Sequence, residues 1–301
     1  MSQEVSSQLR KLVVALIIIA ALFMIFVEPF LVEEMTYGVQ AGQTQKINKL
    51  IADNDPMQHV LMPARVMVGW AYPLWMSLAV LGGFILLLVA KPLYNGAVWA
   101  KGVSLVCLAM PACGGAYMLV PYMRFVYPTA KVFPPALIVM AAGLIPYFAI
   151  LWFDRGDLLQ KAIDGWVFLM LGVTAAEAWA NGHAAHRILL GHPKMPLYAE
   201  GIFVLQPGRN LSWLALVLLV GAIYFAATRS KVGWYLAMSG AAAAAAAGIA
   251  THLVRATTWD WMFQFLMGLA IIIPLLIPMV KERLVETPEE RLVAEGRAAQ
   301  V

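Results

Sequence analysis

The sequence predicts an all-α integral membrane protein, a bundle of eight transmembrane helices with both termini in the cytoplasm. The composition indicates the class, because 62% of the 301 residues are hydrophobic and only 13% are charged, whereas a soluble protein carries roughly 25% charged residues. The apolar residues also fall into long runs separated by short polar connections. The net charge of +4 comes from basic residues scattered between these runs, so we expect no nucleic-acid partner.

Eight segments are long enough to cross a hydrocarbon core of about 30 Å at about 1.5 Å per residue. In chain order they cover residues 11–32, 64–90, 97–120, 133–153, 164–189, 211–228, 232–254 and 259–280. Residues 1–280 are therefore expected to form one transmembrane bundle, and residues 281–301 a short polar cytoplasmic tail. Within the tail, Pro288 and the glutamates after it are typical of the start of a short helix.

The basic residues favour one orientation. With a cytoplasmic N-terminus, 12 of the 21 Lys and Arg residues fall on the cytoplasmic side, as the positive-inside rule predicts. The connections at 33–63 and 190–210, both interpreted as loops, then face outward, and so do all five histidines. The bundle can also be read as two four-helix halves, 1–153 and 164–280. Because no residue-level repeat is visible, an internal duplication stays a hypothesis.

Glu177 is the acidic residue expected about midway along a span, whereas the other acids, Glu28 among them, lie near predicted span ends. An unpaired carboxylate at that depth costs several kcal/mol, which makes it a functional candidate. Thr174 and Asn181 stand three residues before and four residues after it, on the same helical face. This stripe predicts a proton-transfer or quinone-binding group. The alternative is that the helix ends near Asn181 and Glu177 is interfacial.

Three histidines follow: His183, His186 and His192. The first two are three residues apart and share a helical face, so with His192 they could chelate copper or zinc. The stretch resembles the histidine boxes of membrane desaturases and hydroxylases, which use more histidines than this chain has. Glycines at 182 and 191 favour an ordinary helix end at the membrane surface, so we expect no metal.

A haem b site is a further interpretation. Such a haem commonly takes two histidines from facing helices of a bundle, and His186 with His252 is the best-placed pair. Arg255 lies one turn beyond His252. The run of small residues from Gly240 to Gly248 would let a flat ring approach the backbone, but close helix packing explains it equally well.

Arginines and aromatic residues gather at the outer ends of the predicted spans. Arg65 and Arg124 are among the arginines, and several Trp and Tyr residues fall at the same level. An aromatic belt at the membrane surface accounts for most of them. The alternative is an outer pocket that binds a quinone headgroup.

These observations favour a membrane subunit of a respiratory or photosynthetic electron-transfer complex that binds quinone near the outer face. We expect contacts with membrane lipid and with other subunits, in the cytoplasmic (inner) membrane of a bacterium or archaeon. The general architecture resembles the haem-free quinone-binding anchors of molybdenum reductases, and also the two-times-four-helix haem A synthases, although the latter are expected to carry histidines in spans of both halves. A membrane metalloenzyme and a proton-coupled transporter that uses Glu177 remain alternatives.

Overall fold

The structure, a computed structural model, describes residues 7–154, 156–191, 202–255 and 258–286, and every element in these ranges is a helix. The helices are α1 (Ser7–Phe26), α2 (Glu28–Ala52), α3 (Gln58–Tyr94), α4 (Val98–Phe125), α5 (Tyr127–Ala130), α6 (Pro135–Trp152), α7 (Leu158–Gly191), α8 (Leu205–Ala227), α9 (Lys231–Val254), α10 (Asp260–Leu275) and α11 (Pro278–Val285). The predicted all-helical bundle is confirmed. The tail helix expected after Pro288, like His192, lies outside the described residues.

Seven of the described helices are long and apolar enough to cross a membrane: α1, α3, α4, α6, α7, α8 and α9. The eighth predicted span, 259–280, is not one straight helix. It divides into α10 and α11, which meet at an angle of 86°. The break has a local cause, because Ile277 is extended and Pro278 begins α11, and a residue before proline is driven out of the helical region.

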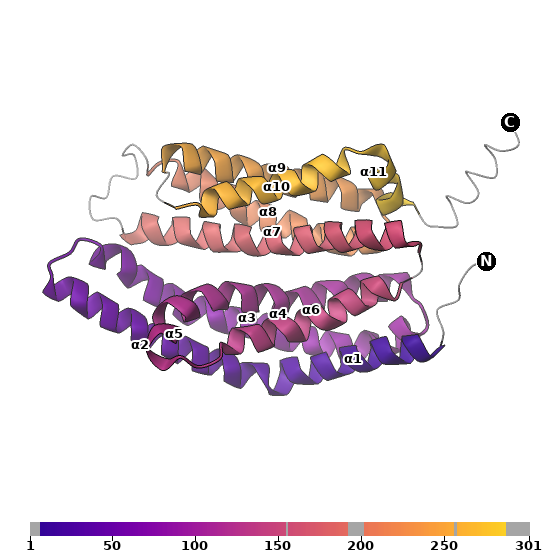
Figure 1. Cartoon of the computed structure of the whole chain (residues 1–301), viewed down its shortest axis with the longest axis horizontal. Coiled ribbons are helices and arrows are strands. Elements are labelled where there is room, and N and C mark those ends of the chain that lie inside the picture. Colours follow the sequence, from indigo (N-terminus) through magenta and orange to yellow (C-terminus); the bar gives the residue numbers. More distant parts are fainter. Residues whose placement is uncertain (1–6, 155, 192–201, 256–257, 287–301) are drawn as a thin grey trace, which may run out of the picture.

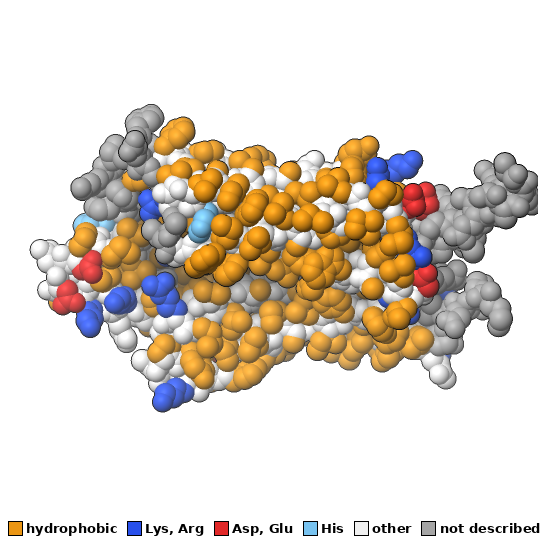
Figure 2. All heavy atoms as spheres, turned by 45° about the horizontal axis from the view of Figure 1, so that its top comes forward, with side chains coloured by type: hydrophobic (Ala, Val, Ile, Leu, Met, Phe, Trp, Pro, Cys, Tyr) orange, Lys and Arg blue, Asp and Glu red, His pale blue; other side chains and the backbone are white. Residues whose placement is uncertain are grey.

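The apolar surface of the bundle identifies the chain as an integral membrane protein. Apolar side chains cover the middle of the face seen in Figure 2, and the charged side chains gather at its two ends. Large residues in the middle of spans remain exposed, such as Val217 of α8 at 67%. An apolar surface of this extent is unfavourable in water and favourable against lipid tails.

The long helices pack as two groups of four. Helices α1, α3, α4 and α6 contact one another in the first group, and α7, α8, α9 and α10 in the second; α3 and α4 contact α7 and α8 across the boundary. Both groups run along the long axis in Figure 1. A Cβ on Gly143 of α6 would lie 2.5 Å from the Leu108 carbonyl oxygen of α4, and one on Gly248 of α9 would lie 2.6 Å from that of Trp261. The small-residue run of α9 therefore serves close helix packing.

Helix α2 corrects the prediction that residues 33–63 form a loop. Most of that segment is helical, and its buried residues recur every three or four positions: Val32, Met35, Val39, Gln43, Ile47 and Leu50. This is the pattern of an amphipathic helix. The segment is too polar to stand out by hydropathy, which is why its helical periodicity was missed. Helix α2 packs mainly on α3.

The two ends of the bundle differ in their chemistry. Figure 1 places the first residues of α1 and the short helix α11 at the same end, which we call the terminal end. The α2–α3 turn and the last residues of α7 lie at the opposite end. Because this end holds His59 and His186, we call it the histidine end.

Candidate functional site

A groove of about 800 Å³ opens at the histidine end between α2, α3 and α7. Its walls include Ile47, Asn48 and Ile51 of α2, His59, Arg65, Val66 and Trp70 of α3, and His186, Leu190 and Gly191 of α7. The lining is mainly apolar, with a few polar groups, which is the usual composition of a site for a small organic molecule. One wall exists only because the segment predicted to be a loop forms helix α2.

Close packing between α3 and α7 shapes one border of the groove. A Cβ on Gly191 would lie 2.2 Å from the His59 carbonyl oxygen, so only glycine lets the end of α7 approach α3 this closely. On the other side, the Gln40 side-chain amide donates to the Arg65 carbonyl oxygen (3.2 Å), and Arg65 Nη1 donates to Thr44 Oγ1 (3.2 Å). These bonds hold α2 beside α3 and position Arg65 at the groove.

His186, predicted to bind a cofactor, lies at the groove and is held from behind by α8. Arg209 Nη1 lies 3.1 Å from His186 Nδ1. The Trp213 ring contacts both residues, with its centroid 5.6 Å from that of His186 and 5.7 Å from the Arg209 guanidinium carbon. The ring of His186 is therefore fixed between α8 and the groove.

His183 is buried among aromatic rings one turn earlier. Its imidazole stacks on Trp70 at 5.8 Å and on Tyr117 at 5.4 Å between centroids, and Trp179 meets it edge-on at 6.0 Å. The Tyr117 hydroxyl is hydrogen-bonded to His183 Nδ1. Trp70 also lines the groove, so His183 stands directly behind one groove wall.

Glu177 and Asn181 are brought together as predicted, and they join a buried polar chain. Asn181 Nδ2 lies 3.3 Å from Glu177 Oε1 and 2.8 Å from Gln264 Oε1 of α10. Gln264 Nε2 donates in turn to Ser212 Oγ of α8 and to the Ala244 carbonyl oxygen of α9, each at 3.0 Å. The chain thus links four helices. Thr174 is buried, but its hydroxyl has no hydrogen-bond partner.

Gln264 was missed in the sequence. The signal that could have found it is its position as a polar side chain inside the apolar run WMFQFLMGLA of the last predicted span. Such a residue almost always faces the bundle interior and finds a partner there.

The remaining predicted site residues lie apart from the groove. His252, near the end of α9, has its ring 5.8 Å from that of Trp259, and Arg255 directly follows α9. Arg124 is exposed at the end of α4, over the ring of Phe125. Helix α8 packs extensively on both α7 and α9, and His186 and His252 contact different aromatic partners. Haem ligation by His186 and His252 therefore stays a prediction.

The spacing of His183, His186 and His192 would allow metal chelation, but His192 lies outside the described residues. Across the described ranges, no group of three or more His, Cys, Asp and Glu residues is arranged to hold a metal ion. His183 is engaged by Tyr117 and His186 by Arg209.

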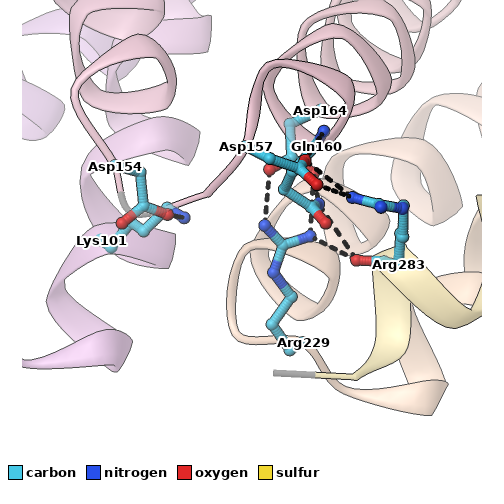
Figure 3. Close-up of polar contacts among 7 residues, drawn as sticks. All are labelled: Lys101, Asp154, Asp157, Gln160, Asp164, Arg229 and Arg283. Carbon is cyan, nitrogen blue, oxygen red and sulfur yellow. Dashed lines mark hydrogen bonds and ion pairs between the residues drawn. The ribbon is translucent and has the colours of Figure 1, made fainter. Parts of the chain in front are cut away.

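A second polar cluster, absent from the sequence-based candidates, lies at the terminal end (Figure 3). Arg229, in the α8–α9 turn, forms a two-pronged ion pair with Asp164 of α7, at 2.8 and 2.5 Å. Gln160 Nε2 donates to Asp164 Oδ1 (3.0 Å), and both Gln160 and Arg229 donate to the Arg283 carbonyl oxygen of α11 (3.1 Å each). The cluster thereby attaches α11 across the end of the second helix group.

Two further ion pairs belong to the same end. Arg283 Nη1 donates to both carboxylate oxygens of Asp157, at 2.8 and 3.0 Å, and Lys101 of α4 pairs with Asp154 beyond α6. In the sequence these basic residues contribute only to the charge bias between the two sides of the membrane. Their pairing was foreseeable in part, because acidic and basic residues alternate among connections that meet at one end.

The Arg229–Asp164 pair is nearly dry, with the two side chains 9% and 4% exposed. Burial disfavours the charged guanidinium of Arg229, which follows the α8 span. The hydrogen bonds and negative charge of Asp164 outweigh that effect and raise the pKa of Arg229 above its ordinary value. Arg229 is therefore fully charged.

Glu28, one of the acids near a predicted span end, is buried. It follows the α1 span by two residues, yet it is only 1% exposed and its Oε2 has no hydrogen-bond partner. Burial raises the pKa of this carboxyl to about 8. Glu28 is thus a buried acid that favours its neutral form.

Comparison of the chain with protein-family models, with curated proteins and with solved structures gave no match. The assignment of function therefore depends on the groove and on the polar residues around it.

Proposed function

We propose that this protein is a membrane subunit of a respiratory or photosynthetic electron-transfer complex and that it binds a quinone headgroup in the groove between α2, α3 and α7. The observation that supports this is the lining: a tryptophan wall, apolar side chains, and the donors Arg65 and His186 in one groove. A quinone is a flat apolar ring with two carbonyl acceptors and a hydrocarbon tail, so its chemistry complements each part of that lining.

The proposed setting follows the charge distribution. We place both termini in the cytoplasm and the groove near the outer face, with the α10–α11 pair as an eighth, bent span. The membrane is then the cytoplasmic (inner) membrane of a bacterium or archaeon, and the partners are lipid and other subunits of the complex. The exposed apolar side chains of the spans support the lipid contact.

The test compares two variants with matched exposure. Val66 lines the groove and Val217 lies on α8, and both are 67% exposed. Val66→Trp fills the groove and is expected to abolish binding of ubiquinone-1, measured by quenching of tryptophan fluorescence in nanodiscs. Val217→Trp is expected to bind as the unmodified chain does.

A chain that purifies without quinone and does not bind added ubiquinone-1 would contradict the proposal. An absorption spectrum and metal analysis of the same preparation test the haem and metal alternatives directly.

The second candidate is a proton-coupled transporter. Its supporting observation is the chain Glu177–Asn181–Gln264–Ser212, which carries polar groups through the interior of the second helix group. Counted along α7, Glu177 lies 13 residues, or about 20 Å, from Asp164 of the terminal-end cluster. A carboxyl at this depth next to an amide chain suits proton transfer.

A further inference from the structure

Arg209 determines which nitrogen of His186 carries the proton. A guanidinium has five N–H donors and no acceptor, and it stays charged in proteins. Because Arg209 Nη1 lies 3.1 Å from His186 Nδ1, the hydrogen bond requires Nδ1 to be the acceptor. In a neutral imidazole the proton then resides on Nε2.

The groove side of His186 is therefore a donor. The Nδ1 atom is turned toward α8, and the opposite edge of the ring, formed by Nε2 and Cδ2, is the edge left for the groove that His186 lines. A protonated Nε2 has no lone pair for haem iron or a metal ion. Transferring the proton to Nδ1 would set an N–H against Arg209, so the arrangement opposes metal ligation by this residue.

A second side chain of the groove lining is also a hydrogen-bond donor. Arg65 adds a second group that can only donate, and none of the described residues that line the groove is acidic. We propose that the groove recognises a hydrogen-bond-accepting oxygen between His186 Nε2–H and Arg65, and that Arg209 is the positioning residue that makes His186 a donor.

This inference rests on the proposed function in one respect, namely that the acceptor is a quinone carbonyl. The same chemistry is offered by the phosphate oxygens of an anionic lipid. The flat wall of Trp70 and the apolar lining favour the quinone, and the experiment distinguishes the two sources.

The first measurement is the tautomer. The full chain, labelled with ¹⁵N-histidine in phosphatidylcholine nanodiscs, is expected to show His186 with protonated Nε2 and unprotonated Nδ1, the signal being assigned from its loss in His186→Gln. Arg209→Met should redistribute the proton between the two nitrogens. Arg124→Met, which removes an exposed arginine outside the groove lining, should leave the signal unchanged. A proton on Nδ1 in the unmodified chain would overturn the inference.

The second measurement is the affinity for ubiquinone-1. Loss of one oriented hydrogen bond in Arg209→Met is expected to weaken binding by about tenfold. Arg209→Lys keeps a donor and should weaken binding less, which also guards against a folding defect in the methionine variant. Equal affinity and an unchanged tautomer in Arg209→Met would refute the role of Arg209 and leave the quinone proposal standing.

The remaining arm separates the two sources of the acceptor. If ubiquinone-1 does not bind but phosphatidylglycerol added to the nanodiscs shifts the His186 Nε2 signal, the donor role is supported and the quinone function fails. If neither ligand shifts that signal, acceptor recognition by His186 is refuted.

Discussion

Removing the Arg229 side chain should destabilise the bundle strongly, because Asp164 would lose its ion-pair partner in a nearly dry site. Asp164 is 4% exposed and receives two of its hydrogen bonds from Arg229. Breaking a buried ion pair by deleting one partner costs about 3–5 kcal/mol. Gln160 would still donate to Asp164, so we expect Arg229→Met to fall toward the lower part of that range.

The matched control is Arg283→Met in the same cluster. Its partner Asp157 is 59% exposed, and exposed pairs contribute about 0–1 kcal/mol. The backbone carbonyl of residue 283, which accepts from Gln160 and Arg229, is retained in this variant. The two variants should therefore differ by about 2 kcal/mol or more in the free energy of unfolding.

The assay is unfolding by SDS titration in mixed micelles, followed by far-ultraviolet circular dichroism. Combining Arg229→Met with Asp164→Asn removes both charges and should recover part of the loss, because no unpaired carboxylate is left. The reasoning is refuted if Arg229→Met is no more destabilising than Arg283→Met. It is also refuted if the double variant loses as much free energy of unfolding as Arg229→Met and Asp164→Asn lose when their separate effects are added.

Three further predictions concern other parts of the fold. With a pKa of about 8 against an ordinary 4.5, folded Glu28 keeps a proton that the unfolded chain releases between these values, so stability falls as pH rises across that window. Glu28→Gln should therefore be more stable than the parent above pH 8 by on the order of a few kcal/mol, while exposed Glu33→Gln shows no such difference in thermal melts at pH 5 and pH 9. Gly143→Ala should cost about 1–3 kcal/mol, because the new Cβ would lie 2.5 Å from a backbone oxygen of α4; Gly165→Ala, with nothing within 4 Å, should be neutral or stabilising by up to about 1 kcal/mol. If Glu177 carries protons, Glu177→Gln should slow quinone-dependent or substrate-dependent proton uptake by reconstituted vesicles by about a hundredfold or more, and an unchanged rate at every pH would exclude that role.

Much of the fold was predictable because burial in lipid depends on local composition. Each of the first seven predicted spans corresponds to a described helix, with ends shifted by a few residues. The eighth span was predicted by hydropathy, but its bend at Pro278 was not. Helix α2 was not predicted, because hydropathy does not reveal an amphipathic helix. Its apolar residues lie on one face and its polar residues on the other, so its mean hydropathy is low.

The site was harder to predict from the sequence, because it is assembled from segments that are distant along the chain. Glu177 and Asn181 were paired correctly, since four residues on one helix are neighbours wherever the helix packs. Their link to Gln264 spans 83 residues, and no local pattern encodes it. The groove likewise needs α2, α3 and α7 together.

Sequence by itself determined that this chain is a helical membrane protein and which segments are long and apolar enough to cross a bilayer. The free-energy cost of exposing an apolar run to water, or backbone polar groups to lipid, depends on each segment separately. Only the tertiary structure decided which charged and aromatic side chains meet. Asp164 pairs with Arg229, and His186 contacts Arg209, because the helices that carry them pack side by side with these side chains facing one another. The chemistry of the groove follows from that packing.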